Sequence, residues 1–561
     1  MFIEKTSFGT IAIINNICDN NGKNGIFLNV TGPSIVLNNT CNNNNENGIS
    51  IHDSSSSIVI NNTCNFNGGY VGLSLILMGG GISLTSSSSL IVANNTCYNN
   101  KEYGISLDNS DFSTVINNTC NHSRIYTAEG VGFSFTSSSS LVVTNNTCNV
   151  IGGRGIFLDE VNTSIVVNNI FLNSGLKLGQ FSKEDLLSNT VENNTVNDLP
   201  LGYLENQTEL TITDSYGQLI LINCTKVIVK NQNCSNTTIG IALYYCQESQ
   251  LVNNSFNNNR NGIFIDSSNS MDVVKNICNN NGGGGIIFHY SNFSIVTDNI
   301  CTSNGGTGIY FGDSNSSTVT NNAITNNEGN GIHLEDSGSS IVANNYCNNN
   351  EWKAIALYDS SSSIVKNNIC YKKHPGWGIS IVDSSSSSVV NNTLYNMGLD
   401  IRTYPTSKEE LLSHVVENNS VNDLPLGYFE NQTELSITES YGQLILINCT
   451  KAIVKNQNCS NTTIGIALYY CQESQVINNT CEYNIKDGIR LELSNGSTLA
   501  NNICNNNGNY GIFLSKSYSS TIINNFCNNN GNGEIYSDEF LKSDFRGDFR
   551  TPSTRRIYFR L

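Results

Sequence analysis

The stretch that decides the fold runs from Gly48 to Cys64 and reads GISIHDSSSSIVINNTC. The same pattern returns from Gly331 to Cys347 as GIHLEDSGSSIVANNYC. In both, glycine and alternating apolar residues precede a serine run, a short apolar run, paired asparagines and a cysteine. Neighbouring copies start about 23 residues apart, as Gly25 and Gly48 do. A fixed period of this length is typical of a solenoid, whose units bury their apolar faces only against their neighbours.

Within each copy, apolar and polar residues alternate with a period of two. After Gly48, Ile49 and Ile51 fall on one face, and Ser50 and His52 fall on the other. Short strands of this kind, separated by Ser, Asn and Gly turns, fit the coils of a parallel β-helix, stacked about 4.8 Å apart. The sequence therefore predicts an all-β fold, a single-stranded parallel β-helix of about 22 coils of roughly 23 residues.

The charge of the chain excludes several classes of partner. The 561 residues carry a net charge of -17, and only 13% are charged. Nucleic acids and anionic lipid surfaces both require basic patches, so neither is expected as a partner. No apolar run approaches the roughly 20 residues of a transmembrane helix. Met1 to Ile14 also lacks the basic and apolar regions of a signal peptide.

A longer duplication is superimposed on the short repeat. Residues 182–250 match residues 407–475 almost position for position, at an offset of 225. Both blocks contain NDLPLGY, from Asn197 and from Asn422, and GQLILINCT, from Gly217 and from Gly442. We predict one continuous β-helix over residues 1–536 that includes both blocks. An irregular basic tail over 537–561 follows it.

The cysteines of the repeat form a column, because equivalent residues of stacked coils lie over one another. Where a copy lacks the cysteine, Phe171, Phe256, Ile324 or Leu394 replaces it. Only apolar residues substitute, so the column is predicted to face inward as mostly free thiols. Parallel side chains about 4.8 Å apart do not match the geometry of a disulfide.

The paired asparagines are predicted to close a turn in each coil. Asparagine tolerates left-handed backbone geometry, and its amide both donates and accepts hydrogen bonds. A stacked column of these amides would pair with the coils above and below, which predicts an asparagine ladder.

These motifs resemble those of right-handed parallel β-helix repeat proteins. The Gly-Ile-x-Leu, Ser-Ser, Ile-Val and Asn-Asn pattern is similar to that of the NosD-type periplasmic family, often described as copper-binding, and of archaeal surface proteins with the same repeat. The resemblance implies a right-handed helix and an extracellular or cell-surface location, although the signal peptide of exported members is missing. Family members with known roles bind or process polysaccharides, act as adhesins or assist the maturation of a copper enzyme.

Most of the chemistry known on this fold has no counterpart in the sequence. The Asn-Thr-Asp, Asp-Asp, Gly-His-Gly and Arg-Ile-Lys motifs of polysaccharide hydrolases are missing, and arginines are scattered among the coils. Copper handling would require grouped His and Met residues, but both types are dispersed.

One face stands out, because large groups replace the Ser, Thr or Ala found at its outward positions elsewhere. Aromatic rings beside carboxylates suit sugars, whose apolar faces stack while their hydroxyls find acceptors. The alternative is a solvated β-face with high aromatic propensity. The candidate carbohydrate-binding residues are Phe264, Asp266, His289, Tyr310, Asp313, His333, Glu335 and Tyr358.

A column of aspartates begins the serine runs at Asp313, Asp336, Asp359 and Asp383. These residues are interpreted as the start of Asx-type turns. Calcium bridging between coils remains an alternative, and no other cofactor is expected.

Taken together, the sequence favours an elongated, non-enzymatic surface or binding protein that contacts carbohydrate, such as a polysaccharide or another glycan, or cell-envelope material. Two alternatives stay open. One is a lyase, hydrolase or epimerase acting on a polysaccharide, and the other is a NosD-like accessory protein in metal-enzyme maturation.

Overall fold

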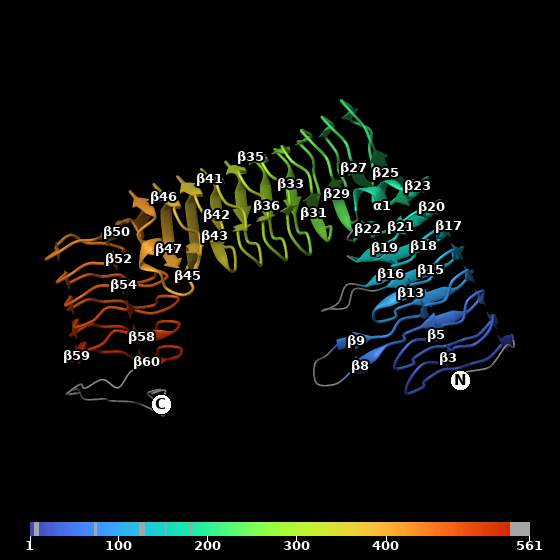
Figure 1. The fold of residues 1–561 in the computed structure, drawn as a ribbon, viewed down its shortest axis with the longest axis horizontal. Helices are drawn as coiled ribbons and strands as arrows, with labels where there is room; N and C mark the ends of the chain where they lie inside the picture. Colours follow the sequence, from blue (N-terminus) through green and yellow to red (C-terminus); the bar gives the residue numbers. More distant parts are fainter. Residues whose placement is uncertain (5–9, 72–75, 123–129, 152, 180–181, 539–561) are drawn as a thin grey trace. The chain divides into compact units, whose positions relative to one another are not determined.

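The structure is a computed structural model that describes residues 1–4, 10–71, 76–122, 130–151, 153–179 and 182–538. It consists of stacked coils of short parallel strands, with two short helices, α1 (Lys183–Leu187) and α2 (Lys408–Leu411) (Figure 1). The predicted parallel β-helix is therefore confirmed. The predicted tail lies outside the described residues apart from Ser537 and Asp538.

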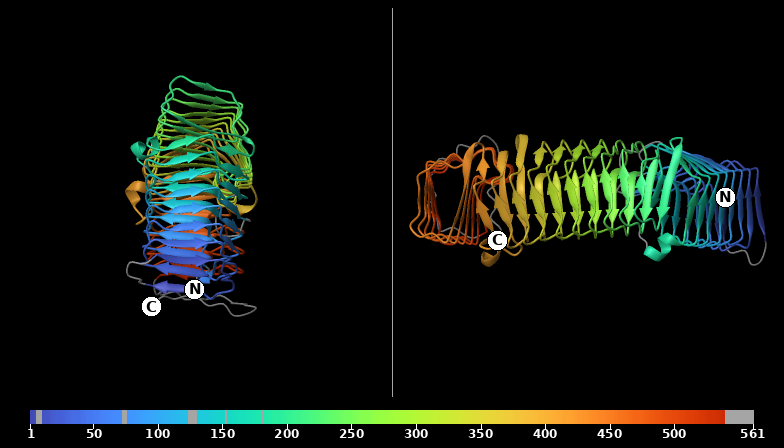
Figure 2. Two further views of the ribbon diagram at one scale, coloured as in Figure 1. Left: turned by 90° about the vertical axis from the view of Figure 1, so that its right-hand side faces the viewer. Right: turned by 90° about the horizontal axis from the view of Figure 1, so that it is seen from above.

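The chain divides into two compact units. Unit 1 comprises residues 1–271 and 276–286, and unit 2 comprises residues 272–275 and 287–561. Within each unit, strands from successive coils lie side by side, and two further views show the same stacking (Figure 2).

Three parallel sheets form the first stack of unit 1. The first sheet contains β1 (Phe2–Glu4), β3 (Ile26–Asn29), β5 (Ile49–His52), β10 (Ile82–Thr85), β13 (Tyr103–Asp108), β16 (Val131–Thr136), β19 (Arg154–Asp159) and β22 (Leu176–Leu178). The second contains β2 (Ile11–Ile14), β4 (Ser34–Leu37), β6 (Ile58–Ile60), β11 (Ile91–Ala93), β14 (Thr114–Ile116), β17 (Val142–Thr144), β20 (Ile165–Val167) and β23 (Thr190–Glu192). The third contains β7 (Thr63–Asn65), β12 (Thr96–Tyr98), β15 (Thr119–His122), β18 (Thr147–Val150), β21 (Ile170–Leu172) and β24 (Thr195–Val196).

A second stack of unit 1 begins after an antiparallel hairpin. Its strands are β25 (Leu199–Glu205), β27 (Gln218–Ile222), β29 (Ile239–Tyr244) and β31 (Asn261–Asp266), with β26 (Thr211–Ile212), β28 (Ile228–Lys230) and β30 (Gln250–Val252) on another face and β33 (Ile277–Asn279) at the end. A separate pair, β8 (Gly69–Val71) and β9 (Ile76–Met78), is antiparallel.

Unit 2 repeats this plan. Its first stack contains β32 (Asp272–Val274), β35 (Ile295–Thr297), β38 (Thr318–Thr320), β41 (Ile341–Ala343), β44 (Ile364–Lys366), β46 (Ser388–Val390) and β48 (Val415–Glu417) on one face. The other faces contain β36 (Ile300–Thr302), β39 (Ala323–Thr325), β42 (Tyr346–Asn348), β37 (Ile309–Gly312), β40 (Ile332–Glu335) and β43 (Lys353–Tyr358), with the long β45 (Ile369–Val382) and β47 (Thr393–Arg402) and the short β49 (Ser420–Val421). The strand β34 (Ile286–His289) lies where the two units divide.

The second stack of unit 2 also follows a hairpin. It contains β50 (Leu424–Glu430), β52 (Gln443–Ile447), β54 (Ile466–Tyr469), β56 (Ile489–Glu492), β58 (Tyr510–Ser515) and β60 (Gly533–Ser537). On another face lie β51 (Ser436–Ile437), β53 (Ile453–Lys455), β55 (Gln475–Ile477), β57 (Thr498–Ala500) and β59 (Thr521–Ile523).

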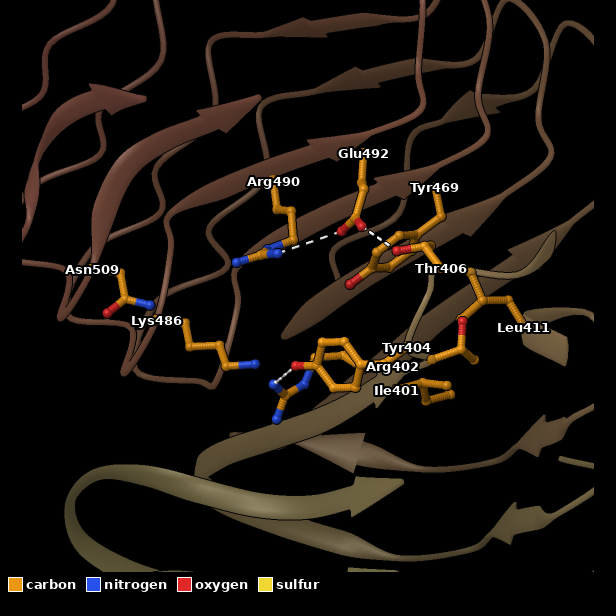
Figure 3. A pocket seen from close by; sticks show the side chains of 11 residues that line it. Ile401, Arg402, Tyr404, Thr406, Leu411, Tyr469, Lys486, Arg490, Glu492 and Asn509 are labelled. Carbon is orange, nitrogen blue, oxygen red and sulfur yellow. Dashed lines mark hydrogen bonds and ion pairs between the residues drawn. The ribbon is translucent and has the colours of Figure 1, made fainter. Parts of the chain in front are cut away.

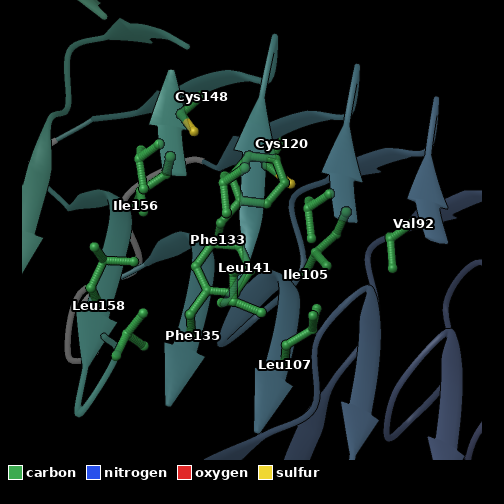
Figure 4. Close-up of a cluster of buried hydrophobic side chains, with 14 of the residues drawn as sticks. Val92, Ile105, Leu107, Cys120, Phe133, Phe135, Leu141, Cys148, Ile156 and Leu158 are labelled. Carbon is green, nitrogen blue, oxygen red and sulfur yellow. The ribbon is translucent and has the colours of Figure 1, made fainter. Parts of the chain in front are cut away.

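The strand register reproduces the sequence repeat. Cys97 pairs with Cys64 on one side and with Cys120 on the other, and Phe171 takes the place of a cysteine opposite Cys148. The predicted inward column is confirmed, since these side chains are at most 1% exposed and the thiols are free. In the core they pack with Phe133, Phe135 and the apolar residues of the glycine-led strands (Figure 4).

The paired asparagines form the predicted ladder. Asn61, the first of one pair, adopts a φ of 55°, and Asn62, the second, is buried. The amide Nδ2 of Asn62 donates to Oδ1 of Asn95 at 3.0 Å, and Asn39 donates in the same way to Asn62. The ladder satisfies polar backbone at a corner that no strand pairs, because Nδ2 of Asn62 also donates to the carbonyl of Val36.

Each duplicated block contains a joint between two stacks. In unit 1, β24 pairs with β25 in antiparallel fashion across Asn197 and Asp198, whose φ angles are 49° and 65°. Such positive angles are typical of the tightest hairpin turns. The side chain of Gln218 then takes the place of a neighbouring strand, because its amide donates to the carbonyl of Leu176 at 2.7 Å and accepts from the N–H of Leu176 at 2.9 Å.

The joint in unit 2 has the same geometry. β49 pairs antiparallel with β50, and Gln443 makes the same two hydrogen bonds to Leu399, both at 2.8 Å. The two duplicated blocks therefore carry the same structural joint.

Candidate functional site

An aromatic row lies on one face of unit 2. It consists of His289, Tyr310, His333 and Tyr358, all half-buried. The ring centroids are 5.3 Å apart between His289 and Tyr310, 5.3 Å between Tyr310 and His333, and 5.2 Å between His333 and Tyr358. Tyr310 and His333 touch because they are register partners on the parallel strands β37 and β40.

The last ring of the row, Tyr358, is not the register partner of His333. Tyr358 pairs in register with Glu335, whereas the residue opposite His333 is the small, buried Ala356. The ring of Tyr358 therefore passes over Ala356 to contact His333 edge-on, at an interplanar angle of 74°.

Polar groups flank the row on both sides. Tyr310 Oη donates to Glu335 Oε2 at 2.8 Å. Lys353 Nζ donates to Tyr358 Oη, lies 4.9 Å from the centroid of that ring, and is 5.5 Å from the ring of Trp377 on β45. Hydroxyl-bearing ligands would thus meet a carboxylate, an ammonium group and aromatic faces within a few strands.

Two rings of the row, Tyr310 and His333, are uncharged at neutral pH. Burial, together with the hydrogen bond to Glu335, raises the pKa of Tyr310. Burial lowers the pKa of His333 to about 4. Its Nε2 is buried without a hydrogen-bond partner among the described residues, which suits a neutral imidazole.

The remaining predicted site residues are Phe264, Asp266 and Asp313. Phe264 and Asp266 belong to β31 of unit 1, where Phe264 packs against Tyr244 and beneath the ammonium group of Lys177. Asp313 occupies an exposed turn with a φ of 50°. The structure therefore brings together His289, Tyr310, His333, Glu335 and Tyr358.

Sequence reasoning missed Lys353 and Trp377, which extend the row. Each of them directly precedes the residue that opens its repeat copy, which is Ala354 in one copy and Gly378 in the next. The two residues pair with each other in register. The sequence pattern assigned outward-facing positions only to residues that follow the opening residue of a copy. Extending the outward pattern by one position on the other side would have found both residues.

The aspartate column occupies left-handed turns. Asp313, Asp336, Asp359 and Asp383 have φ angles of 47° to 50°. Slight burial and the neighbouring carboxylates of Asp336 and Asp383 raise the pKa of Asp359.

Metal binding was tested on the described residues. Copper sites use grouped His, Cys or Met ligands, and calcium sites use grouped oxygens. Within the described ranges, no three His, Cys, Asp or Glu side chains gather so as to hold a metal ion. The described residues therefore lack the grouped His and Cys ligands of a copper centre. The same ranges contain no helix long and apolar enough to cross a membrane.

Several solved structures are similar to this chain. The Dettilon tailspike protein is 13% identical, with a TM-score of 0.32, over 69% of this chain and 64% of its own, which is less than two thirds. A periplasmic alginate epimerase is 11% identical, with a TM-score of 0.29, over 59% of this chain and 76% of its own. An alginate lyase from Paenibacillus sp. is 12% identical, with a TM-score of 0.27, over 41% of this chain and 92% of its own. Similarity at this level carries no argument about ligand or activity.

Family profiles give a firmer assignment. A search of curated proteins finds no match. The profile described as "Right handed beta helix region" matches residues 2–124. The profile described as "Periplasmic copper-binding protein (NosD)" matches residues 74–180, 181–299, 224–411 and 410–540, which together exceed half of the chain. The chain therefore belongs to the NosD family of β-helix proteins.

Proposed function

We propose that this protein is a non-enzymatic binding protein that holds a carbohydrate chain along the aromatic row. The observation that carries the proposal is the unbroken ring contact from His289 to Tyr358, with Glu335 and Lys353 beside it. Sugar rings stack their apolar faces on aromatic side chains, and their hydroxyls pair with carboxylates and ammonium groups.

The spacing of the row favours a polymer. Successive centroids are 5.2 to 5.3 Å apart, which is comparable with the length of one pyranose unit in an extended chain. Each stacked ring contributes about 1 kcal/mol, so a row of rings would give a repeated, individually weak affinity. The periplasmic description of the family supports a location outside the cytoplasm, where glycans of the cell envelope are available.

The test is a glycan array probed with the wild type and with the double variant Tyr310→Ala/Tyr358→Ala. The matched control is Tyr346→Ala/Tyr371→Ala, because these tyrosines are 43% and 38% exposed on another face of the same coils. We expect the first variant to lose at least tenfold in affinity, from two lost stacking contacts, and the control to bind as the wild type does. Unchanged binding by the first variant, with its β signal intact by circular dichroism, would overturn the proposal.

A further inference from the structure

Unit 2 contains a cavity of about 200 Å³ at its joint, here called the corner pocket. The joint places the end of β47 opposite β54 and β56, so that residues 86 positions apart come into contact. The side chains that matter for its chemistry are Arg402, Tyr404, Tyr469, Lys486, Arg490 and Glu492 (Figure 3).

Buried carboxylates hold the cations of this pocket in place from behind. Asp400, whose side chain is 1% exposed, accepts from Lys486 Nζ at 2.9 and 3.0 Å and from Arg402 Nε at 2.9 Å. Asp487 is fully buried and accepts from Arg490 Nε at 2.9 Å and from Nη2 at 2.6 Å. The cations are therefore fixed without help from a ligand.

The wall of the cavity consequently carries more positive charge than the whole set of charged side chains, because the carboxylates of Asp400 and Asp487 lie behind it. Lys486, Arg402 and Arg490 line the cavity, whereas the described residues of its wall include Glu492 as the one carboxylate. Glu492 is itself bound, since it accepts from Thr406 and lies 3.5 Å from Arg490 Nη1. Guanidinium groups bind planar carboxylates especially well.

A second feature of the pocket is an unused hydroxyl. Tyr469 is only 4% exposed, and its ring points into the cavity between Arg490 and Tyr404 (Figure 3). Its Oη has no hydrogen-bond partner among the described residues. Burial raises the pKa of Tyr469, so the phenol stays protonated and can donate. Because Tyr469 lines the cavity, its hydroxyl is available to donate a hydrogen bond to a ligand there.

The pocket adjoins the aromatic row through Trp377. Lys486 Nζ lies 4.6 Å from the Trp377 ring and Arg402 Cζ lies 5.8 Å from it, while Lys353 contacts the same ring from the row. The cavity is smaller than the roughly 300 Å³ at which drug-sized sites begin, so it has room for a single sugar ring at most.

We propose that the corner pocket binds the carboxylate-bearing ring of an acidic glycan, a uronate, whose carboxylate meets Arg402, Arg490 and the Tyr469 hydroxyl. The proposal deepens the proposed function and rests on it for the assumption that the ligand is a carbohydrate. It adds that the glycan is anionic. It also adds that one sugar ring of the glycan turns away from the aromatic row at Trp377 and enters the corner pocket.

The test measures binding of galacturonate, galactose and acetate to the full chain by calorimetry or ligand-observed NMR. We expect galacturonate to bind at least tenfold more tightly than galactose, and more weakly at high salt because ions screen the contact. Tyr469→Phe removes only the hydroxyl and should weaken galacturonate binding about fivefold to tenfold. The control Tyr244→Phe, at the equivalent position of unit 1, should not.

Each other outcome has a definite meaning. Equal binding of galactose would overturn the anionic site, and equal binding of acetate would overturn the sugar ring. No binding of galacturonate, or binding unchanged by Tyr469→Phe, would overturn the pocket. The variant Tyr310→Ala/Tyr358→Ala should retain monosaccharide binding, so failure of the row and failure of the pocket are separable.

Discussion

The joints of unit 1 and unit 2 share one backbone design but differ in chemistry. In both, a hairpin starts a new stack and a glutamine side chain, Gln218 or Gln443, bonds the edge of the preceding strand. The residue after the bonded leucine is Lys177 in unit 1 and Asp400 in unit 2. The duplication thus copied a joint, and the side chains placed on it then diverged.

The divergence extends across the facing strand. Phe264 and Asp266 of unit 1 pair in register with Ala242 and Tyr244, whereas Arg490 and Glu492 of unit 2 pair with Ala467 and Tyr469. Lys177 stacks on Phe264 at 4.4 Å, while Asp400 forms ion pairs with Lys486 and Arg402. The comparison shows that the joint tolerates an aromatic or an ionic filling, because its backbone bonds come from glutamine and threonine.

The largest difference is expected for the central charge of each joint. Asp400→Ala would leave Lys486 and Arg402 without their buried partner, at a cost of about 3–5 kcal/mol in the free energy of unfolding. Lys177→Ala removes a cation from an aromatic face and should cost only about 1 kcal/mol. Urea unfolding of the full chain measures both. Equal losses would contradict the view that the ion pairs of Asp400 stabilise their joint more than the contact between Lys177 and Phe264 does.

The glutamines should behave alike, which tests the shared part of the comparison. Gln218→Met and Gln443→Met both leave the N–H and carbonyl of a strand edge unpaired, so each should destabilise its joint by about 3 kcal/mol. Hydrogen exchange at Leu176 and Leu399 should accelerate. Gln432→Met is the control, because the amide of Gln432 makes one exposed bond, to the carbonyl of Glu430. If only one of the two glutamine variants is destabilised, the joints are not equivalent.

The next largest expected difference between the units is in how their stability depends on pH. His414 Nδ1 accepts from Ser387 N–H, where the equivalent residue of unit 1, Asn189, accepts from Ser164. Burial lowers the pKa of His414 from 6.5 to about 4. Between these pH values the unfolded chain binds a proton that the folded chain does not. Stability therefore falls as the pH drops from 6.5 towards 4, and this contribution levels off below pH 4.

The variant His414→Asn installs the residue found in unit 1 and should remove this loss, roughly 3 kcal/mol at pH 4. Unfolding curves of both proteins at pH 7 and pH 4 provide the measurement. Carboxylates and His333 titrate in both proteins, so the difference between the proteins isolates His414. The same pH dependence in both would show that the His414 ring is not buried as a neutral base.

These contrasts also show which parts of the fold and of the candidate site can be predicted from the sequence. The cysteine column and the asparagine ladder could be predicted because the repeat period is nearly constant. Equivalent positions of successive copies therefore carry similar residue types. The row from His289 to Tyr358 was predicted for the same reason, since Ser occupies its positions in other copies. Phe264 and Asp266 were predicted together with this row, and they belong to unit 1, a division of the chain that the repeat alone does not reveal.

The corner pocket was not predicted, because it depends on a break in the repeat. Arg490 looks scattered in the sequence, and its proximity to Arg402 arises only when the hairpin after Val421 starts a new stack. A signal was nevertheless present. Aligning the flanks of the two blocks places Arg490 opposite Phe264 and Glu492 opposite Asp266, so a cation replaces an aromatic ring beside a copied block while the acidic position is kept.

The smallest expected effect concerns the paired tyrosines. Tyr244 Oη donates to the carbonyl of Leu178 at 3.4 Å, whereas the Tyr469 hydroxyl has no partner in the described part of the chain. Tyr244→Phe should therefore cost about 0.5–1 kcal/mol. Tyr469→Phe should leave the free energy of unfolding almost unchanged, because the substitution removes a hydroxyl that faces the cavity and makes no bond within the described residues. Paired thermal and urea unfolding curves resolve such a difference. If Tyr469→Phe costs as much as Tyr244→Phe, its hydroxyl already has a partner in the folded protein, and the pocket loses the donor that distinguishes it from the joint of unit 1.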